Sequence, residues 1–236
     1  MNTELKKIIE DSNNIVLFTG AGISCASGIP DFRSANGLYN EKTAIEFPPE
    51  RIISDWCLKE HPETFFEFYK SKMIYKNALP NVAHKFFAKL EKQGKLKAVI
   101  TQNIDNLHQK AGSKNVQELH GSVERNYCVN CGKKYDLDYI LSQDGVPKCK
   151  KCGGMVRPDV VLYGEMLDMT VIEKAINYIA QADCLIIVGT SLTVQPAASM
   201  VKYFKGRKLV LINKESTPYD RYANLVINDS IENVIL

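Results

Sequence analysis

The stretch NIVLFTGAGISCASG, residues 14–28, carries the strongest indication of how this chain folds. Its first six residues form a nearly continuous apolar run, which is typical of a strand buried on both faces of a parallel sheet. Gly20 and Gly22 directly follow the run and mark a turn from the strand into a helix. The stretch therefore predicts one strand–turn–helix unit of an α/β protein.

The same alternation continues along the chain. Further apolar runs lie at 96–101, 116–119, 160–163, 184–189, 209–213 and 225–227, and helical patterns lie at 3–12, 62–78, 82–93, 171–182 and 197–205. Strands that alternate with helices indicate a doubly wound parallel sheet of the Rossmann-like kind. We expect residues 1–39, 81–122 and 158–236 to form this α/β domain. Residues 40–80, largely helical, and 123–157, which hold two cysteine pairs, are expected to form a small inserted domain.

Composition excludes several classes of protein. The 236 residues are 45% hydrophobic and 24% charged, which is typical of a globular protein and not of a disordered or collagen-like one. The apolar runs are far shorter than the roughly 20 residues of a membrane span, and the start of the chain is polar. We therefore expect a cytoplasmic protein that does not contact membranes. The net charge of +3 is too small to indicate nucleic-acid binding.

Four of the seven cysteines form two pairs, Cys128 with Cys131 and Cys149 with Cys152. Two residues between paired cysteines let one tight turn direct both sulfurs at a tetrahedral metal centre, and the spacing between the pairs fits a zinc ribbon. Disulfides or a redox dithiol are the alternatives, and a reducing compartment disfavours disulfides. Four thiolates leave no open position for a substrate, so one structural zinc ion is expected.

Glycines at a strand-to-helix turn let the backbone approach a diphosphate. The loop at 20–28 is an incomplete dinucleotide motif, because Cys25 replaces the third glycine and no acidic residue follows at the usual distance. Taken alone, it fits a nucleotide site and a plain tight turn equally well. Polar sequences at the ends of other expected strands are more informative, because the carboxyl ends of parallel strands meet in one crevice. They are Thr101–His108 (TQNIDNLH), Leu119–Gly121 (LHG), Gly189–Ser191 (GTS) and Asn213. In addition, Gly28–Arg33 (GIPDFR) places an aromatic ring and a guanidinium just beyond the glycine loop.

These motifs, with the two cysteine pairs and the segment Arg157–Glu165, occur in the order and spacing of one family. From Gly20 to the end, the chain resembles a sirtuin, an NAD-dependent protein-lysine deacylase, and its length resembles the compact bacterial type. The resemblance implies that NAD lies along the glycine loop, in a nicotinamide pocket and against an adenosine side. The residues it implies are Gly20, Ala21, Gly22, Cys25, Phe32, Arg33, Gln102, Asn103, Ile104, Asp105, His120, Gly189, Thr190, Ser191, Asn213, Lys214, Ser230 and Ile231.

The resemblance also implies the reaction. The bond from nicotinamide to ribose breaks, the acyl oxygen of a lysine attacks the ribose, and the products are nicotinamide, O-acyl-ADP-ribose and free lysine. His120 is then the general base on the ribose hydroxyls, which suits an imidazole with an ordinary pKa of about 6.5. Asn103 and Asp105 are expected to act with it, Asp105 by accepting a hydrogen bond from the carboxamide. Phe32 is expected to shield the site from water.

Acylated-lysine proteins are the implied partners, bound as an extended strand between Val160–Glu165 and the segment after Ser191. The implied contact residues are Val161, Tyr163, Gly164 and Glu165. The family often has Phe where this chain has Tyr163, whose hydroxyl needs a partner if it is buried. Relatives that prefer acidic acyl groups carry a Tyr and an Arg three residues apart. Here the pair is Tyr69 and Lys72, which lacks the bidentate guanidinium, so deacetylation is expected to exceed desuccinylation.

Two other functions remain open at the level of sequence. One is a protein mono-ADP-ribosyltransferase, because it shares cleavage of the bond to nicotinamide. The other is a zinc-ribbon module that binds nucleic acid, for which Lys148, Lys150 and Lys151 are the available basic residues. We expect a monomeric enzyme without direct nucleic-acid contacts.

Overall fold

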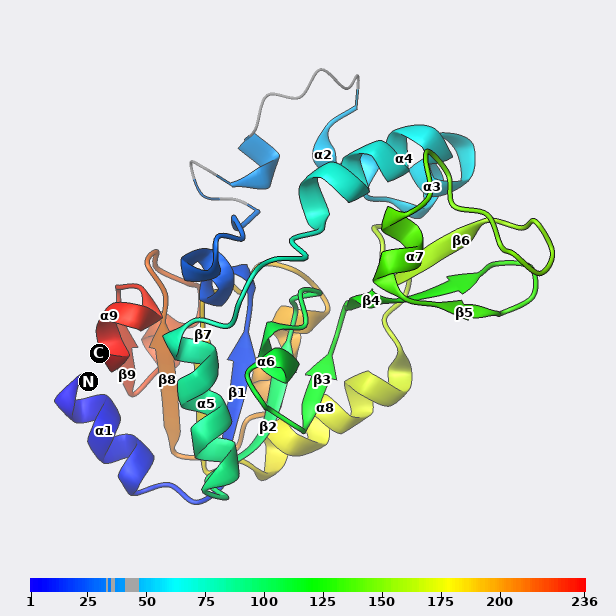
Figure 1. Cartoon of the computed structure of the whole chain (residues 1–236). Coiled ribbons are helices and arrows are strands. Elements are labelled where there is room, and N and C mark those ends of the chain that lie inside the picture. Colours follow the sequence, from blue (N-terminus) through cyan, green and yellow to red (C-terminus); the bar gives the residue numbers. More distant parts are fainter. Residues whose placement is uncertain (33, 35–36, 41–46) are drawn as a thin grey trace.

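The computed structural model describes residues 1–32, 34, 37–40 and 47–236. Its larger part is a parallel six-stranded sheet in the order β3-β2-β1-β7-β8-β9 (Figure 1). The strands are β1 (Ile15–Thr19), β2 (Leu96–Thr101), β3 (Val116–Glu118), β7 (Cys184–Val188), β8 (Lys208–Ile212) and β9 (Leu225–Ile227). The order reverses between β1 and β7, and ligands of doubly wound sheets bind at the carboxyl ends of the strands at such a reversal.

Helices cover both faces of this sheet (Figure 1). On one face α1 (Thr3–Glu10), α5 (Val82–Lys92) and α9 (Ile231–Ile235) bury Leu5, Phe87 and Val234 against the strands. On the other face lie α8 (Met169–Gln181) and the 3-10 helix η4 (Ala197–Tyr203). Strands β1 and β7 are buried along their whole length, which explains why their sequences are continuous apolar runs. The predicted α/β architecture is confirmed.

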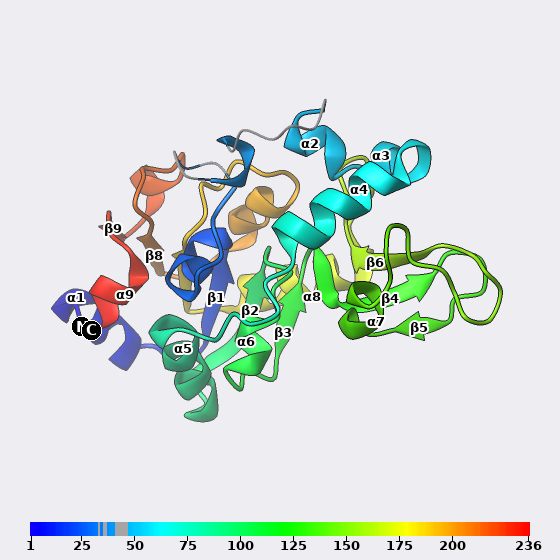
Figure 2. The same ribbon diagram turned by 45° about the horizontal axis from the view of Figure 1, so that its top comes forward.

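A smaller part lies to one side of the main sheet (Figure 2). Its antiparallel sheet has the order β5-β4-β6, with β4 (Gly121–Cys128), β5 (Lys134–Tyr135) and β6 (Val156–Val160), next to α7 (Leu137–Leu141). Above it lie the short helices α2 (Pro49–Ile52), α3 (Asp55–Glu60) and α4 (Pro62–Phe68), and the π-helical turn η3 (Tyr69–Met73). The helical and cysteine-bearing modules share one core, in which Phe65, Phe66 and Phe68 pack with Val123 and Val156.

Three sequence predictions need correction. The strand expected at 160–163 in the parallel sheet is β6, which ends at Val160 and pairs antiparallel with β4. Its residues alternate between buried and half-buried, so it has one core-facing side rather than two. The helix expected over 62–78 ends at Met73, because Ile74 is extended. The helix expected over 197–205 is a 3-10 helix that ends at Tyr203.

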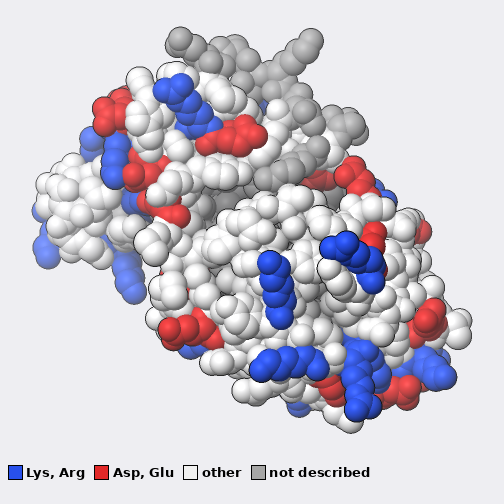
Figure 3. Space-filling view, turned by 180° about the vertical axis from the view of Figure 1, so that it is seen from behind, with Lys and Arg blue, Asp and Glu red and all other residues white. Residues whose placement is uncertain are grey.

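The remaining elements are η1 (Ala21–Ser27), η2 (Leu38–Asn40), α6 (Leu107–Lys110) and η5 (Asp220–Tyr222). The domain boundaries expected near 122 and 158 fall inside β4 and β6, and the division into two domains remains a proposal. Among the described residues, no helix has both the length and the apolar character to cross a membrane. On the face seen from behind, Lys and Arg side chains are interspersed with Asp and Glu (Figure 3).

Candidate functional site

A cavity of about 680 Å³ lies at the carboxyl ends of the main-sheet strands, within the range of small-molecule sites. Its walls come from the loop after β1, the segments after β2, β3, β7 and β8, the start of α9, and the segment after β6. Apart from Arg33, which lies outside the described residues, every residue predicted for NAD or the peptide lines it. These are Gly20, Ala21, Gly22, Cys25, Phe32, Gln102, Asn103, Ile104, Asp105, His120, Val161, Tyr163, Gly164, Glu165, Gly189, Thr190, Ser191, Asn213, Lys214, Ser230 and Ile231.

The glycine loop lies directly against the end of β7. The amide of Gly22 donates to the carbonyl of Gly189 at 2.9 Å. A Cβ added to Gly22 would lie 2.7 Å from the Gly189 Cα, and Gly189 itself has a φ of +62°. Only glycine at both positions permits this contact. The loop itself forms the seven-residue 3-10 helix η1, and among the described residues no long α-helix follows it directly.

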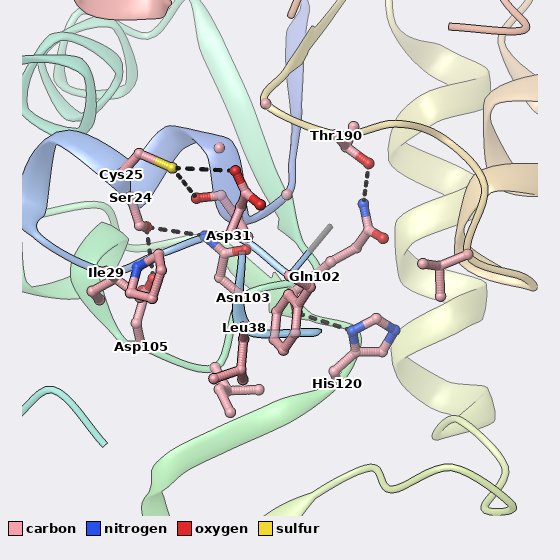
Figure 4. Close-up of a pocket in the computed structure, with 18 of the residues that line it drawn as sticks. Ser24, Cys25, Ile29, Asp31, Leu38, Gln102, Asn103, Asp105, His120 and Thr190 are labelled. Carbon is pink, nitrogen blue, oxygen red and sulfur yellow. Dashed lines mark hydrogen bonds between the residues drawn. The ribbon is translucent and has the colours of Figure 1, made fainter. Parts of the chain in front are cut away.

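Three polar side chains form a connected network on the cavity wall (Figure 4). The Ser24 hydroxyl donates to Asp105 Oδ2 at 2.7 Å, and Asn103 Nδ2 donates to Ser24 Oγ at 3.1 Å. The other Asp105 oxygen accepts the backbone amide of Leu107 at 2.9 Å. The network holds the Asn103 amide and the Asp105 carboxylate in fixed orientations at the end of β2. Sequence reasoning missed Ser24 as a site residue, although it lies within the glycine loop.

His120 lies where the main sheet meets the antiparallel sheet. Its Nδ1 is 2.9 Å from the carbonyl oxygen of Gln102 (Figure 4). Since a carbonyl only accepts, Nδ1 carries the proton and Nε2 keeps its lone pair. Burial lowers the pKa of His120 below its ordinary value, and the bond to Gln102 opposes that shift. His120 is therefore a neutral base near pH 7.

Cys25 is a half-buried thiol that faces Asp31. Its Sγ lies 3.8 Å from the carbonyl oxygen of Ala21 and 3.9 Å from Asp31 Oδ2. Burial, and secondly the Asp31 carboxylate, raise the pKa of the thiol. A raised pKa means that Cys25 is mostly protonated and weakly nucleophilic at neutral pH. The structure thus favours a packed thiol in the cavity wall.

The opposite wall is the segment that follows β6. The amide of Val161 donates to the carbonyl of His120 at 3.0 Å, which ties the segment to the histidine. Tyr163 exchanges backbone hydrogen bonds with Ile53 and Asp55 on the neighbouring helical module. Arg157 donates to both carboxylate oxygens of Glu165, and one of these also accepts the amide of Leu162. Glu165 therefore shapes the turn at Gly164.

On the far side of the cavity, side chains after β2, β7 and β8 lie close together. Gln102 Nε2 donates to Thr190 Oγ1 at 3.0 Å (Figure 4), and the Ser191 hydroxyl pairs with that of Thr193 at 2.8 Å. Asn213 Nδ2 donates to the carbonyl of Glu215 at 2.7 Å. This is the side predicted for adenosine. Sequence reasoning did not single out the lining residues Leu38, Tyr39, Asp229 and Glu232.

A second candidate site lies in the antiparallel sheet, outside this cavity. The sulfurs of Cys128, Cys131, Cys149 and Cys152 all lie within 4.8 Å of one another. The closest separations, 3.4 and 3.6 Å, are far longer than a disulfide and close to the roughly 3.8 Å between ligands of a tetrahedral zinc thiolate centre. All seven cysteines are described, and all are free. The donor set therefore fits a closed metal site.

Comparisons with known proteins agree on one family. A protein-family model described as "Sir2 family" matches residues 20–196 of this chain. An NAD-dependent protein deacetylase of Clostridium perfringens is 63% identical over 98% of this chain and 96% of its own length. A solved structure of Sir2 with a p53 peptide and NAD+ has a TM-score of 0.85 and 41% identity, over 98% of this chain and 94% of that one. Sir2Tm bound to a propionylated peptide has a TM-score of 0.85 and 40% identity over the same shares.

Proposed function

Because the chain belongs to the Sir2 family, we propose that it uses NAD and one molecule of water to remove acetyl groups from protein lysines. The acetyl group passes to the ADP-ribose part of NAD, and nicotinamide, O-acetyl-ADP-ribose and free lysine are released. It is an NAD-dependent protein deacetylase, as its relatives are named. One observation carries the residue-level proposal: a single cavity brings together the glycine loop, the Ser24–Asn103–Asp105 network, His120 and the segment 161–165.

In this proposal NAD supplies a ribose that becomes electrophilic when the bond to nicotinamide breaks, and the chain's own residues do the rest. The glycine loop accepts the diphosphate, because Gly22 and Gly189 leave room for a close backbone approach. Asn103 and Asp105 orient the carboxamide end, held by Ser24. Nε2 of His120 accepts a proton from a ribose hydroxyl, because Nδ1 already carries a proton that it donates to the Gln102 carbonyl. Phe32, also in the cavity wall, excludes water while the bond to nicotinamide breaks, and the one water that the reaction consumes enters after the acyl oxygen has attacked the ribose.

We propose that the acylated peptide enters as a strand beside the segment 161–165. One edge of this segment is already paired with residues 53–55, while its other side lines the cavity together with Val194 and Gln195. A strand inserted there gains backbone hydrogen bonds that depend little on its sequence.

We propose acetyl and similarly short uncharged acyl groups as the preferred substrates. Of the two residues that correspond to an acidic-acyl pair, Lys72 lines the cavity, whereas Tyr69 is fully buried and its ring stacks on Phe65. A succinyl carboxylate would therefore not meet both groups together. The relative solved with a propionylated peptide is consistent with a short apolar acyl group. A succinyl peptide with a kcat/KM equal to or above that of the acetyl peptide would contradict this preference.

We also propose that the four cysteines hold one structural zinc ion. Four thiolates saturate a tetrahedral centre, so the ion supplies folding energy to the antiparallel sheet and takes no part in the reaction.

The experiment is incubation of the protein with an acetyl-lysine peptide and NAD, with products identified by mass. Nicotinamide and O-acetyl-ADP-ribose in equal amounts are expected. Labelled protein without deacetylation would indicate an ADP-ribosyltransferase instead. The variant His120→Ala is expected to bind NAD but not to deacetylate, and retained activity would remove His120 as the base. His61→Ala is the matched control, because His61 packs on Trp56 and Phe47 and does not line the cavity.

A further inference from the structure

Tyr163 and Tyr39 meet at the rim of the cavity. Their hydroxyl oxygens lie 2.8 Å apart, and either can donate to the other. The two residues are 124 positions apart in the sequence, one in the segment after β6 and the other in η2. The structure thus gives the Tyr163 hydroxyl the partner that a phenylalanine at this position would not need.

Tyr39 is joined to Phe32 by backbone and side-chain contacts. The amide of Tyr39 donates to the carbonyl of Phe32 at 2.9 Å, and the amide of Leu38 donates to that of Asp31 at 2.8 Å. The rings of Phe32 and Tyr39 pack edge to face, with centroids 5.4 Å apart. A constraint on the Tyr39 hydroxyl therefore also restrains Phe32, which lines the cavity.

Tyr163 is held just as firmly on its own side. Its amide donates to the Ile53 carbonyl at 3.1 Å, and its carbonyl accepts the Asp55 amide at 3.0 Å. Because these two hydrogen bonds fix the backbone of Tyr163, its side chain is a well-positioned hydrogen-bond partner for the Tyr39 hydroxyl. Tyr163 is 41% exposed, so the bond lies at the surface and adds little to global stability.

We propose that the hydrogen bond between the Tyr39 and Tyr163 hydroxyls is a positioning contact that holds Phe32 at the cavity and thereby strengthens NAD binding. In this way a side chain of the segment proposed to bind the peptide, Tyr163, also affects the affinity for NAD. This inference rests on the proposed function, because it assigns the cavity to NAD. The proposal makes Tyr163 a determinant of NAD affinity in this chain. The stronger binding of NAD requires both hydroxyls, because they form a single hydrogen bond.

The test compares Tyr39→Phe, Tyr163→Phe and the double variant with the parent protein. Each single change removes one oxygen and keeps the ring. Losing one neutral hydrogen bond corresponds to a weakening of roughly two- to tenfold. We expect the KM for NAD at saturating acetyl peptide, and the Kd of NAD by calorimetry, to rise by that factor in each variant while kcat changes less than twofold. The double variant should equal the single ones, because the pair is one interaction.

Tyr222→Phe is the matched control, since Tyr222 is exposed and does not line the cavity. Melting temperatures of all variants should equal that of the parent, which separates positioning from folding. The proposal is overturned if either single variant binds NAD as tightly as the parent, or if the two effects multiply in the double variant. Absence of deacetylation in the parent would instead contradict the proposed function, and the calorimetric comparison would still decide the role of the tyrosines.

Discussion

Two buried histidines behind the cavity make the stability of this protein depend on pH. His84 in α5 and His108 in α6 have ring centroids 4.9 Å apart and are 0% and 1% exposed. His84 Nδ1 lies 3.0 Å from Asn81 Oδ1, and His108 Nε2 lies 3.1 Å from the hydroxyl of Thr19. Burial lowers the pKa of both, to about 3 for His108, with the neighbouring His84 as the smaller cause there.

The sign follows from proton uptake. Below pH 6.5 the unfolded chain protonates these histidines, whereas the folded chain keeps them neutral down to their lowered pKa values. Their contribution to stability is therefore complete above about pH 6.5 and is lost progressively as the pH falls. Well below pH 6.5, each histidine lowers the free energy of unfolding by about 1.4 kcal/mol per pH unit, and above pH 6.5 it has almost no effect. Between pH 7.5 and pH 5.0 the loss is therefore about 2 kcal/mol for each histidine. Together they remove about 4 kcal/mol, a large part of the roughly 5–15 kcal/mol that stabilises a typical domain.

The assay is urea unfolding of the parent and of His108→Gln at pH 7.5 and 5.0, with zinc held constant. Glutamine reaches Thr19 but does not titrate, so the loss of unfolding free energy on acidification should shrink by about 2 kcal/mol. His61→Gln serves as the control for removing a histidine elsewhere. If the parent and His108→Gln lose the same free energy between the two pH values, the reasoning is refuted. Carboxylates and thiols titrate in both proteins, so their contribution cancels when the pH-dependent change in unfolding free energy of His108→Gln is subtracted from that of the parent.

Three further outcomes are expected. Gly121→Ala should lower kcat/KM at least about 100-fold. Gly121 has a φ of +76°, and an added Cβ would collide with the Asp159 carbonyl, so the substitution should displace the neighbouring His120. A kcat/KM within tenfold of the parent value would contradict this. In a pH–rate profile, kcat/KM should rise with pH with a midpoint below pH 6.5, since burial lowers the pKa of His120, the proposed base; a midpoint above pH 6.5 would exclude that assignment. Removing zinc with a chelator should lower the melting temperature by several degrees, and an unchanged value would argue against a structural metal at the four cysteines.

Most of the parallel sheet was predictable because its central strands, β1 and β7, are buried on both faces. The runs at 96–101 and 225–227 coincide with β2 and β9, and a continuous apolar run needs no knowledge of a partner strand. Strand β4 was not predicted, because Glu124 and Arg125 break its apolar pattern and its pairing with β6 is irregular between Ser122 and Asn126. An irregular strand of this kind lacks the period-2 alternation by which a regular one-sided strand can be recognised in a sequence.

For the cavity, the motifs at strand ends could be predicted because topology alone brings those ends together. The contacts between side chains could not. Ser24 meets Asp105 across 81 positions, and Tyr39 meets Tyr163 across 124, so neither pair has a local sequence signal. The same holds for the thiol of Cys25: its place in the loop could have lowered its pKa, and only the structure shows that burial and Asp31 raise it.

Strand β4 explains how a metal distant from the cavity can affect its chemistry. The strand begins at Gly121, next to His120, and ends at Cys128, one of the four metal-ligand candidates. Because β4 is irregular, the β6 partners of Gly121 and Cys128 are Val160 and Val156, four residues apart, so the two ends lie roughly 13 Å from each other. That distance exceeds the Debye length of about 8 Å at physiological ionic strength, so a direct effect of the metal charge on His120 is small. The two ends are nevertheless joined, because β4 pairs with β6 on both sides of the irregularity between Ser122 and Asn126. Strand β6 leads directly to Val161, whose amide donates to the His120 carbonyl. Loss of a metal ion from the four cysteines would loosen β4 and β6 together, and with them His120, the proposed base, and the segment 161–165 proposed to bind the peptide.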